Sequence, residues 1–233
     1  MTKRIIIGEE TTRNPLSIMG KYAGECWGSD INDDSANRKR GISCLSDGHG
    51  RVSEFPQIYI KIEGFSARFC RELYTHIGGS PTRLQASTRY LNYQKGFEYI
   101  VPPKIAKDEK ALSVYNKAMD NILSNMKELV DLGIPKEDIA NLLPLGMEST
   151  MVLRTNLRML IDMSRQRLCT RAYWEFREFM HMLIKELCAY DEDYKYICEN
   201  YFGAKCDFLG YCPESNSCGR WEKGCSKKKP LNN

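Results

Sequence analysis

The segment of residues 75–93, THIGGSPTRLQASTRYLNY, gathers an unusual density of hydrogen-bonding side chains. Gly78 and Gly79 permit positive φ angles and let a ligand approach bare backbone amides. Arg83 and Arg89 carry guanidinium groups whose geometry suits a phosphate. Hydroxyl groups are added by Ser80, Thr82, Ser87 and Thr88. The segment therefore fits an anion cradle, and it also fits a solvated surface loop made of turn-forming residues.

Arginines gather a second time further along the chain, beside Asn156 and Asp162. They are Arg154, Arg158, Arg165, Arg167 and Arg171. Residues four apart share a face of a helix, which would place Arg154 beside Arg158. The same spacing would place Arg167 beside Arg171. A surface ion pair between Arg158 and Asp162 explains one arginine of this cluster. The others stand among apolar residues, and a half-buried arginine needs an anion.

The pattern of apolar residues predicts the elements that must position these two clusters. Helices are expected at residues 14–27, 65–77, 107–134, 147–168 and 171–190, with a short helix from Pro135. Strands are expected at residues 56–64 and 96–103, and within residues 75–93 only the end could form a strand. Residues 31–41 are predicted to be a polar connector, and residues 42–55 to end in a glycine-rich turn around His49. Helices around a modest sheet predict an α+β fold, with a small antiparallel sheet packed with long helices.

Composition limits the class of protein. The chain has 233 residues, of which 42% are hydrophobic and 27% charged, and this suits one domain or a domain with a small appendage. The net charge of +4 is compatible with an anionic small ligand and does not require nucleic acid. The sequence contains no apolar run of about 18 residues, so no membrane span is expected. The apolar run in MTKRIIIGEE is too short for a secretory signal, and a cytoplasmic location is expected.

Ten cysteines are unevenly distributed, and half of them fall in the last 36 residues. We therefore expect a main domain at residues 1–197 and a cysteine-rich C-terminal extension at residues 198–233. The candidate metal ligands of the extension are Cys206, Cys212, Cys218 and Cys225. Their spacing differs from the paired knuckles of most structural zinc sites. A structural metal and a set of free thiols both remain open.

The order of these segments resembles the flavin-dependent thymidylate synthases. That family carries a helix ending in Arg-His-Arg, then a loop with Ser and Asn-Glu, then Ser-x-Arg-Tyr. Here His76 matches the central histidine, Ser80 the loop serine, and STRY at residues 87–90 the closing motif. Upstream, the family's Gly-His, with a glutamate five residues after the histidine, matches His49 and Glu54.

The second half of the resemblance lies in the arginine-rich cluster. The family has Leu-Pro ahead of Asn-x-Arg, an arginine eleven residues after that asparagine, and then Ala-x-Trp-Glu. Here the matches are Leu143–Pro144, Asn156 to Arg158, Arg167, and AYWE at residues 172–175. The resemblance covers roughly residues 14–190, and each motif taken singly is weak.

The chain also departs from the family pattern. The flanking arginines of the triplet are replaced by Thr75 and Ile77, and PTRLQA stands in place of the loop with Asn-Glu. The family's arginine ahead of Leu-Pro falls near residues 140–141, where this chain has Ala and Asn. Arg83, Arg154 or Arg171 would then have to replace the lost contacts to a nucleotide.

The resemblance implies a homotetramer that binds FAD between subunits and converts dUMP to dTMP. Methylenetetrahydrofolate would supply the one-carbon unit, and NADPH would reduce the flavin. The implied substrate-binding set is Arg83, Ser87, Arg89 and Arg167, with Ser87 and Arg167 at the reacting centre. The implied cofactor-binding set is His49, His76, Ser80, Asn156, Arg158 and Asp162. The safer role for Ser87 is that of a hydrogen-bond donor.

Two other functions remain open. The altered arginines leave room for a related flavoenzyme that modifies C5 of another pyrimidine nucleotide. A nucleic-acid-binding protein would use the basic loop and the cysteine-rich extension. Against that function, the aromatic residues are not interleaved with the basic ones as stacking platforms would be.

Overall fold

The structure is a computed structural model that describes residues 2–93 and 96–222. The chain divides into two compact units. The first unit contains the residues up to Ile6, Ile60–Ile77 and Thr82–Arg154. The second contains Ile7–Tyr59, Gly78–Pro81 and the residues from Thr155 onward.

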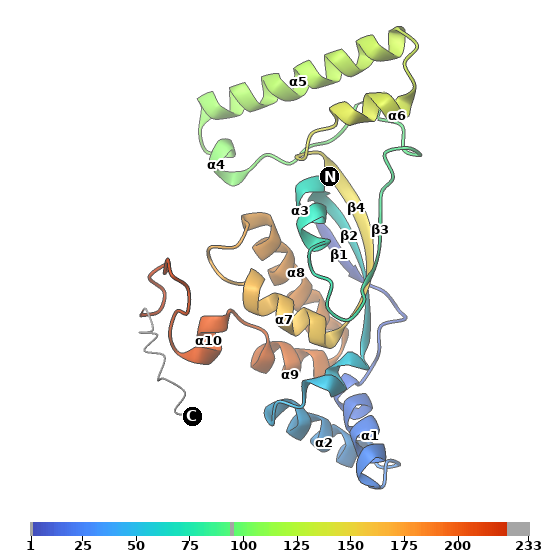
Figure 1. The fold of residues 1–233 in the computed structure, drawn as a ribbon, viewed down its shortest axis with the longest axis vertical. Coiled ribbons are helices and arrows are strands. Elements are labelled where there is room, and N and C mark those ends of the chain that lie inside the picture. The colour runs from blue at the N-terminus through green and yellow to red at the C-terminus, as the bar shows by residue number, and fades with distance from the viewer. Residues whose placement is uncertain (1, 94–95, 223–233) are drawn as a thin grey trace, which may run out of the picture. The chain divides into compact units, whose positions relative to one another are not determined.

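A four-stranded sheet is the scaffold of the first unit (Figure 1). Its strands are β1 (Arg4–Ile7), β2 (Gln57–Ser66), β3 (Thr82–Gln85) and β4 (Glu148–Asn156), in the order β1-β2-β4-β3. Strands β3 and β4 are antiparallel, with Arg83 opposite Leu153 and Leu84 opposite Val152. Alternation buries Ile58, Ile60 and Ile62 on one side of β2, as the sequence predicts. The expected α+β class with a small antiparallel sheet is confirmed.

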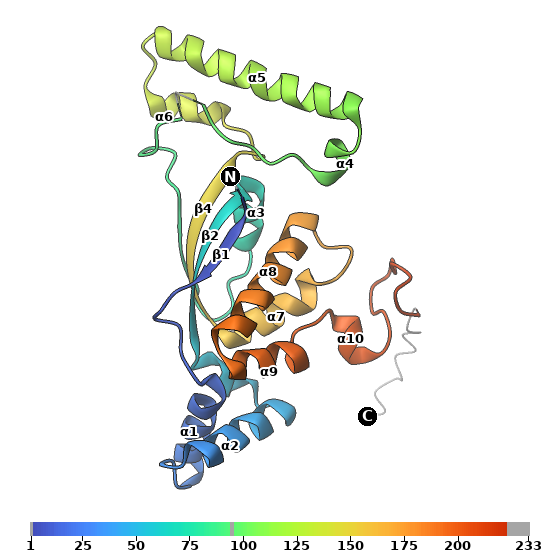
Figure 2. The ribbon, with the colours of Figure 1, turned by 180° about the vertical axis from the view of Figure 1, so that it is seen from behind.

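Helices and one apolar cluster complete the first unit. The helical elements are α3 (Ala67–Leu73), α4 (Pro103–Ala106), α5 (Glu109–Asp131), α6 (Lys136–Ile139) and the 3-10 turn η2 (Ala140–Leu142). Both views place α6 beside α5 (Figures 1 and 2). Their shared core contains Phe97, Met119, Met126, Ile139 and Met147. The amphipathic pattern of α5 therefore buries its apolar face within this unit.

Seven helical elements make up most of the described part of the second unit. They are α1 (Pro15–Trp27), α2 (Asp34–Ser46), η1 (Gly50–Glu54), α7 (Leu157–Arg167), α8 (Trp174–Tyr190), α9 (Glu192–Tyr201) and α10 (Lys205–Leu209). Helices α1 and α2 touch at Gly20 and Gly41, where a Cβ on Gly20 would lie 1.8 Å from the Asn37 carbonyl oxygen. Phe176, Phe179 and Leu183 are fully buried along one face of α8.

Helix α2 corrects the predicted polar connector at residues 31–41. Asp33 caps this helix by accepting hydrogen bonds from the Ser35 and Ala36 N–H groups. The helix is polar overall, yet it buries Asn37, Gly41, Cys44 and Leu45. Helix α2 packs against α1 through glycines, which add little to a pattern of apolar residues. The apolar pattern therefore did not predict this helix.

Residues 147–168 form a strand followed by a helix, not the single long helix predicted. In β4 the buried residues alternate through Met151, Leu153 and Thr155, which is the period of a strand. Helix α7 begins only at Leu157 and ends at Arg167. Arg154 therefore lies on β4, and Arg171 lies beyond the end of α7, so neither expected helical arginine pair exists.

Two strand predictions around the hydroxyl-rich loop were also wrong. Residues 96–103 form only an isolated bridge, between Tyr99 and Met147. Residues 75–93 contain strand β3 in their middle, where the end had been expected.

Within the described residues, no helix is long and apolar enough to cross a membrane. Helix α9 runs across residue 197, and the domain boundary proposed there stays a prediction.

Candidate functional site

The start of α7 is built around the side chain of Asn156. The Asn156 Oδ1 atom accepts a hydrogen bond from the Met159 N–H at 2.9 Å and so caps the helix. The Leu157 N–H donates to the Pro56 carbonyl at 3.1 Å. Asn156 is buried. These two bonds fix where the helix begins. They therefore also fix the direction in which Arg158, the second residue of the helix, leaves the backbone.

Arg158 points to the turn after α2, which carries His49. Its Nη1 atom lies 2.6 Å from a carboxylate oxygen of Glu54. Within the described residues this ion pair takes the place of the expected pair with Asp162, which is exposed on α7. The Arg158 side chain is still 46% exposed. The guanidinium is thus oriented by Glu54 and keeps a face that a ligand can reach.

The loop of residues 78–81 belongs to the same unit and lies against Asn156. Gly79 has a φ of 70°, and a Cβ there would lie 2.2 Å from the Asn156 amide nitrogen. Ser80 also has a positive φ, 48°, which is unusual for a residue with a side chain. The second unit therefore brings together Ser80, Asn156, Arg158 and the turn of His49. The sequence proposed these residues as one cofactor set on resemblance alone.

Arg83 organises residues 74–76 within the first unit. Its guanidinium donates hydrogen bonds to the carbonyl oxygens of His76 and Tyr74, and it lies 5.2 Å from the centre of the Tyr74 ring. Its Nε atom is buried and has no hydrogen-bond partner among the described residues. Burial lowers the pKa of this guanidinium. Arg83 therefore closes residues 74–76 onto β3, a structural role the sequence did not suggest.

Ser87 and Arg89 follow β3 in the first unit. The Ser87 Oγ atom accepts a hydrogen bond from the Arg89 N–H at 3.2 Å, and the Arg89 side chain lies 3.5 Å from Glu137. Both members of that ion pair are largely exposed, so the pair contributes little to stability. Arg154 donates a hydrogen bond to the Thr82 hydroxyl at 3.2 Å across the β3–β4 ladder.

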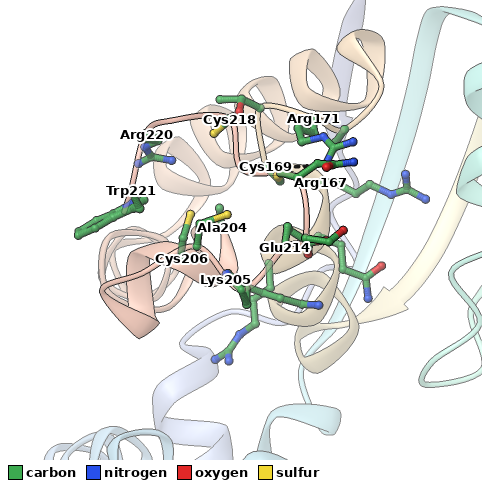
Figure 3. Close-up of a pocket in the computed structure, with 18 residues that line it drawn as sticks. Arg167, Cys169, Arg171, Ala204, Lys205, Cys206, Glu214, Cys218, Arg220 and Trp221 are labelled. Carbon is green, nitrogen blue, oxygen red and sulfur yellow. Dashed lines mark hydrogen bonds between the residues drawn. The ribbon is translucent and has the colours of Figure 1, made fainter. Parts of the chain in front are cut away.

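A cavity of about 660 Å³ opens in the second unit between the end of α7 and the C-terminal extension (Figure 3). Its cationic lining residues are Arg165, Arg167, Arg171, Lys205 and Arg220. Arg167 also lies 4.5 Å from the centre of the Phe176 ring. Among the described residues that line the cavity, Glu214 is the only acidic one. The cavity is therefore strongly electropositive, and the extension supplies part of its wall.

Sequence reasoning missed the part of the cavity that comes from the extension. Lys205, Arg220 and Trp221 stand between or beside cysteines, and the pattern of cysteines drew attention away from them. Arg220 forms an ion pair with Asp207 at 2.7 Å, and the Trp221 indole N–H donates to the same carboxylate. The basic and aromatic pair Arg220–Trp221, which stands between Cys218 and Cys225 in the sequence, was the available signal.

The expected metal set is only partly within the described residues, because Cys225 lies outside them. Cys206 and Cys212 are buried, while Cys218 is exposed. Burial raises the pKa of the Cys206 thiol, and a hydrogen bond with Thr170 lowers the pKa of the Cys218 thiol. Among the described residues, no three His, Cys, Asp or Glu side chains are placed to hold one metal ion. The four-cysteine set named from the sequence stays a prediction.

A family model described as thymidylate synthase complementing protein matches residues 9–190. The chain belongs to this family. Proteins named flavin-dependent thymidylate synthase are among its relatives. The one from Pyrococcus abyssi is 35% identical over 173 residues, which is 73% of this chain and 70% of the relative. The one from Nitratidesulfovibrio vulgaris is 28% identical over 235 residues, which is 90% of this chain and 92% of the relative.

The fold agrees with that of solved structures. A flavin-dependent thymidylate synthase from Helicobacter pylori, crystallised with FAD and dUMP, matches with a TM-score of 0.65 and 19% identity. The match covers 85% of this chain and 99% of that one. The family expected from the sequence motifs is confirmed. The residues assigned to individual ligands stay predictions.

Replacing Asn156 with alanine should destabilise the protein by about 1 kcal/mol, because the Met159 N–H loses its acceptor. Asn156→Ser is the matched control, since its hydroxyl oxygen can cap the same N–H group. The shift in the midpoint of chemical denaturation measures the difference. Equal midpoints for the alanine and serine variants would show that the cap does not stabilise α7.

Proposed function

We infer that this protein is a flavin-dependent thymidylate synthase, which methylates dUMP reductively to dTMP. One observation carries the conclusion: the family match spans residues 9–190 and includes every residue proposed above for the flavin and the nucleotide. The comparison structure that contains FAD and dUMP covers 85% of this chain, which supports the same ligands here.

We propose that FAD is held at the start of α7. The residues present fit this cofactor, because Arg158 is oriented by Glu54 and remains accessible, while Gly79 has no Cβ that would displace Asn156. A guanidinium beside the N1–C2 edge of a flavin stabilises the negative charge of the reduced ring. Bound FAD would supply the redox chemistry, and the protein would position and polarise it. His49, His76, Ser80 and Asp162 complete the proposed cofactor set.

We propose that dUMP is held by Ser87, Arg89 and Arg167, with Arg83 supplying charge that the altered triplet lacks. Ser87 uses its oxygen as the acceptor for the Arg89 N–H, so its O–H remains able to donate to a pyrimidine. The buried Nε of Arg83 has no partner among the described residues and is one of the donors that this side chain has left. NADPH and methylenetetrahydrofolate are the proposed co-substrates.

We propose a homotetramer, as the family resemblance implies. In the first unit, Leu84 and Val152 are directly opposite across the β3–β4 ladder and are 68% and 41% exposed. Ile77 and Tyr90, at the two ends of the hydroxyl-rich segment, are also exposed. An apolar surface beside a proposed ligand loop supports a subunit contact there.

Cytoplasmic localisation stays a prediction. The metal expected in the extension is a separate proposal, because it does not depend on the flavin or nucleotide.

Purified protein incubated with dUMP, methylenetetrahydrofolate, FAD and NADPH should form dTMP, measured by chromatography of the nucleotides. A parallel reaction with dCMP tests the related flavoenzyme with another pyrimidine substrate. Product from dCMP alone would move the activity to that alternative. A colourless protein that neither retains added FAD nor forms a product would contradict the flavoenzyme altogether.

Arg158→Ala should weaken FAD retention by at least tenfold, because a charge-assisted hydrogen bond contributes on the order of 1.5–3 kcal/mol. Lys185→Ala, which removes an exposed cation from α8, is the matched control and should bind FAD normally. Flavin absorbance after gel filtration measures retention, and titration of apoprotein measures affinity. If both variants retain FAD equally, Arg158 lies outside the cofactor site.

Arg167→Ala and Arg83→Ala should each weaken dUMP binding by roughly 10- to 100-fold and FAD binding much less. The reason is that both are proposed to pair with the nucleotide. Calorimetric titration with dUMP on the FAD-loaded protein measures the effect. An Arg83→Ala variant with normal dUMP affinity would leave Arg83 only its observed role of closing residues 74–76 onto β3.

A further inference from the structure

Four cysteines from three separate segments line the cavity of the second unit. Cys169 follows α7, Cys206 lies on α10, and the loop after α10 supplies Cys212 and Cys218. Figure 3 shows Cys169, Cys206 and Cys218 around the same space. Cys169 is remote in sequence from the other three and precedes the extension. Its presence here means that the thiols gather by folding and not merely by their density in the sequence.

A single metal ion and a metal cluster place different demands on four thiolates. A zinc ion holds its thiolates at about 2.3 Å, so the sulfur atoms must converge on one point. The described residues contain no group of three side chains that converges in this way. A 4Fe–4S cluster instead binds each thiolate at a different iron atom, so the four sulfurs stand apart around a solid body. Four cysteines line the cavity, which is the number of thiolates that such a cluster takes.

The charge around the cavity fits a 4Fe–4S cluster. Four thiolates bound to a cluster core of charge +2 leave a net charge of −2. A buried anion of this kind is costly unless cations and hydrogen-bond donors surround it. Among the described residues that line the cavity, five are cationic and only Glu214 is acidic. Arg220 pairs with Asp207 and Arg167 is assigned above to dUMP, which leaves Arg165, Arg171 and Lys205 to face the cluster. The Nε atom of one of them, Arg165, is buried without a hydrogen-bond partner among the described residues, and its guanidinium covers the Phe208 ring.

Hydrogen bonds also fix the course of the extension and would hold its cysteines in place. The Gly203 N–H donates to the Ser164 hydroxyl on α7, and the Cys212 N–H donates to the Glu222 carbonyl. Arg171 donates to the Asn216 carbonyl at 2.5 Å. These contacts close the loop of residues 212–222 over the end of α7. They involve segments far apart in sequence, and Arg171, Cys212 and Asn216 line the cavity itself.

We propose that Cys169, Cys206, Cys212 and Cys218 bind a 4Fe–4S cluster. The proposal replaces Cys225 of the set expected from sequence with Cys169, and it does not rest on the synthase activity. The cluster fastens the extension to the end of α7, next to Arg167. Its loss should therefore release the extension and expose it to proteolysis.

The test uses the full chain, prepared without oxygen and reconstituted with ferrous iron and sulfide. Flavin absorbs in the same visible region, so iron and acid-labile sulfide are measured chemically after gel filtration. About four of each per chain are expected, with a paramagnetic signal after reduction by dithionite. Cys169→Ser and Cys212→Ser should each lose most of the iron and should be cut faster by protease within the extension.

Three matched variants serve as controls. Cys26→Ser removes an exposed thiol, Cys44→Ser removes a buried one, and Cys225→Ser removes the cysteine that the proposal leaves out. All three should keep the iron and sulfide of the unmodified chain. Circular dichroism of every variant shows whether it folds, and if Cys169→Ser does not fold, the iron and sulfide content of the unmodified protein still decides.

Several results would overturn the proposal. One is about one zinc ion per chain with no bound sulfide after exposure to both metals. A second is loss of iron in Cys225→Ser with retention in Cys169→Ser. A third is a disulfide among these cysteines in protein trapped with a thiol-blocking reagent under anaerobic conditions. None of these results is measured through dTMP formation, so failure of the cluster and failure of the synthase are distinguishable.

Discussion

The change from strand to helix at Asn156 is the constraint on which the candidate cofactor site depends. A strand points successive side chains to opposite faces, whereas a helix rotates them by about 100° per residue. The capping bond from the Met159 N–H to Asn156 fixes the residue at which one pattern replaces the other. Moving that point by one residue would turn Arg158 away from Glu54. The Asn156 side chain also occupies the space beside Gly79, so the cap sets the position of the neighbouring loop as well.

The arginines of this chain serve two physical roles that their sequence does not separate. Arg83 and Arg171 donate to backbone carbonyls and so fix the course of irregular segments. Arg158 and Arg220 form ion pairs with Glu54 and Asp207, which orient a guanidinium without burying it fully. An arginine held in this way loses less side-chain entropy when it meets an anionic ligand. Preorganisation of this kind suits an enzyme whose substrates and cofactor carry phosphate.

The described part of the C-terminal extension packs within the second unit. Ala204, Cys206 and Cys212 are buried, and the extension walls a cavity that also contains Arg167. A short segment with few apolar residues cannot order itself by hydrophobic burial alone. Cross-linking through a metal cluster would supply the missing stabilisation. The electropositive lining of the cavity and the gathering of cysteines then have one common explanation.

The sequence alone determined the family, the α+β class and most helices, because those features rest on local periodicity and on motif spacing. It identified β2 from the alternation of Ile58, Ile60 and Ile62, and it identified α5 from its amphipathic pattern. It placed Asn156 and Arg158 together because they are two residues apart. Tertiary structure decided what local patterns could not encode. Helix α2 forms because glycines allow it to approach α1, and β4 forms because β2 and β3 provide its hydrogen-bond partners. Likewise, Cys169 joins the cysteines of the extension only because the chain folds back over the end of α7. Such contacts depend on residues distant in the chain, and no local preference of either partner specifies them.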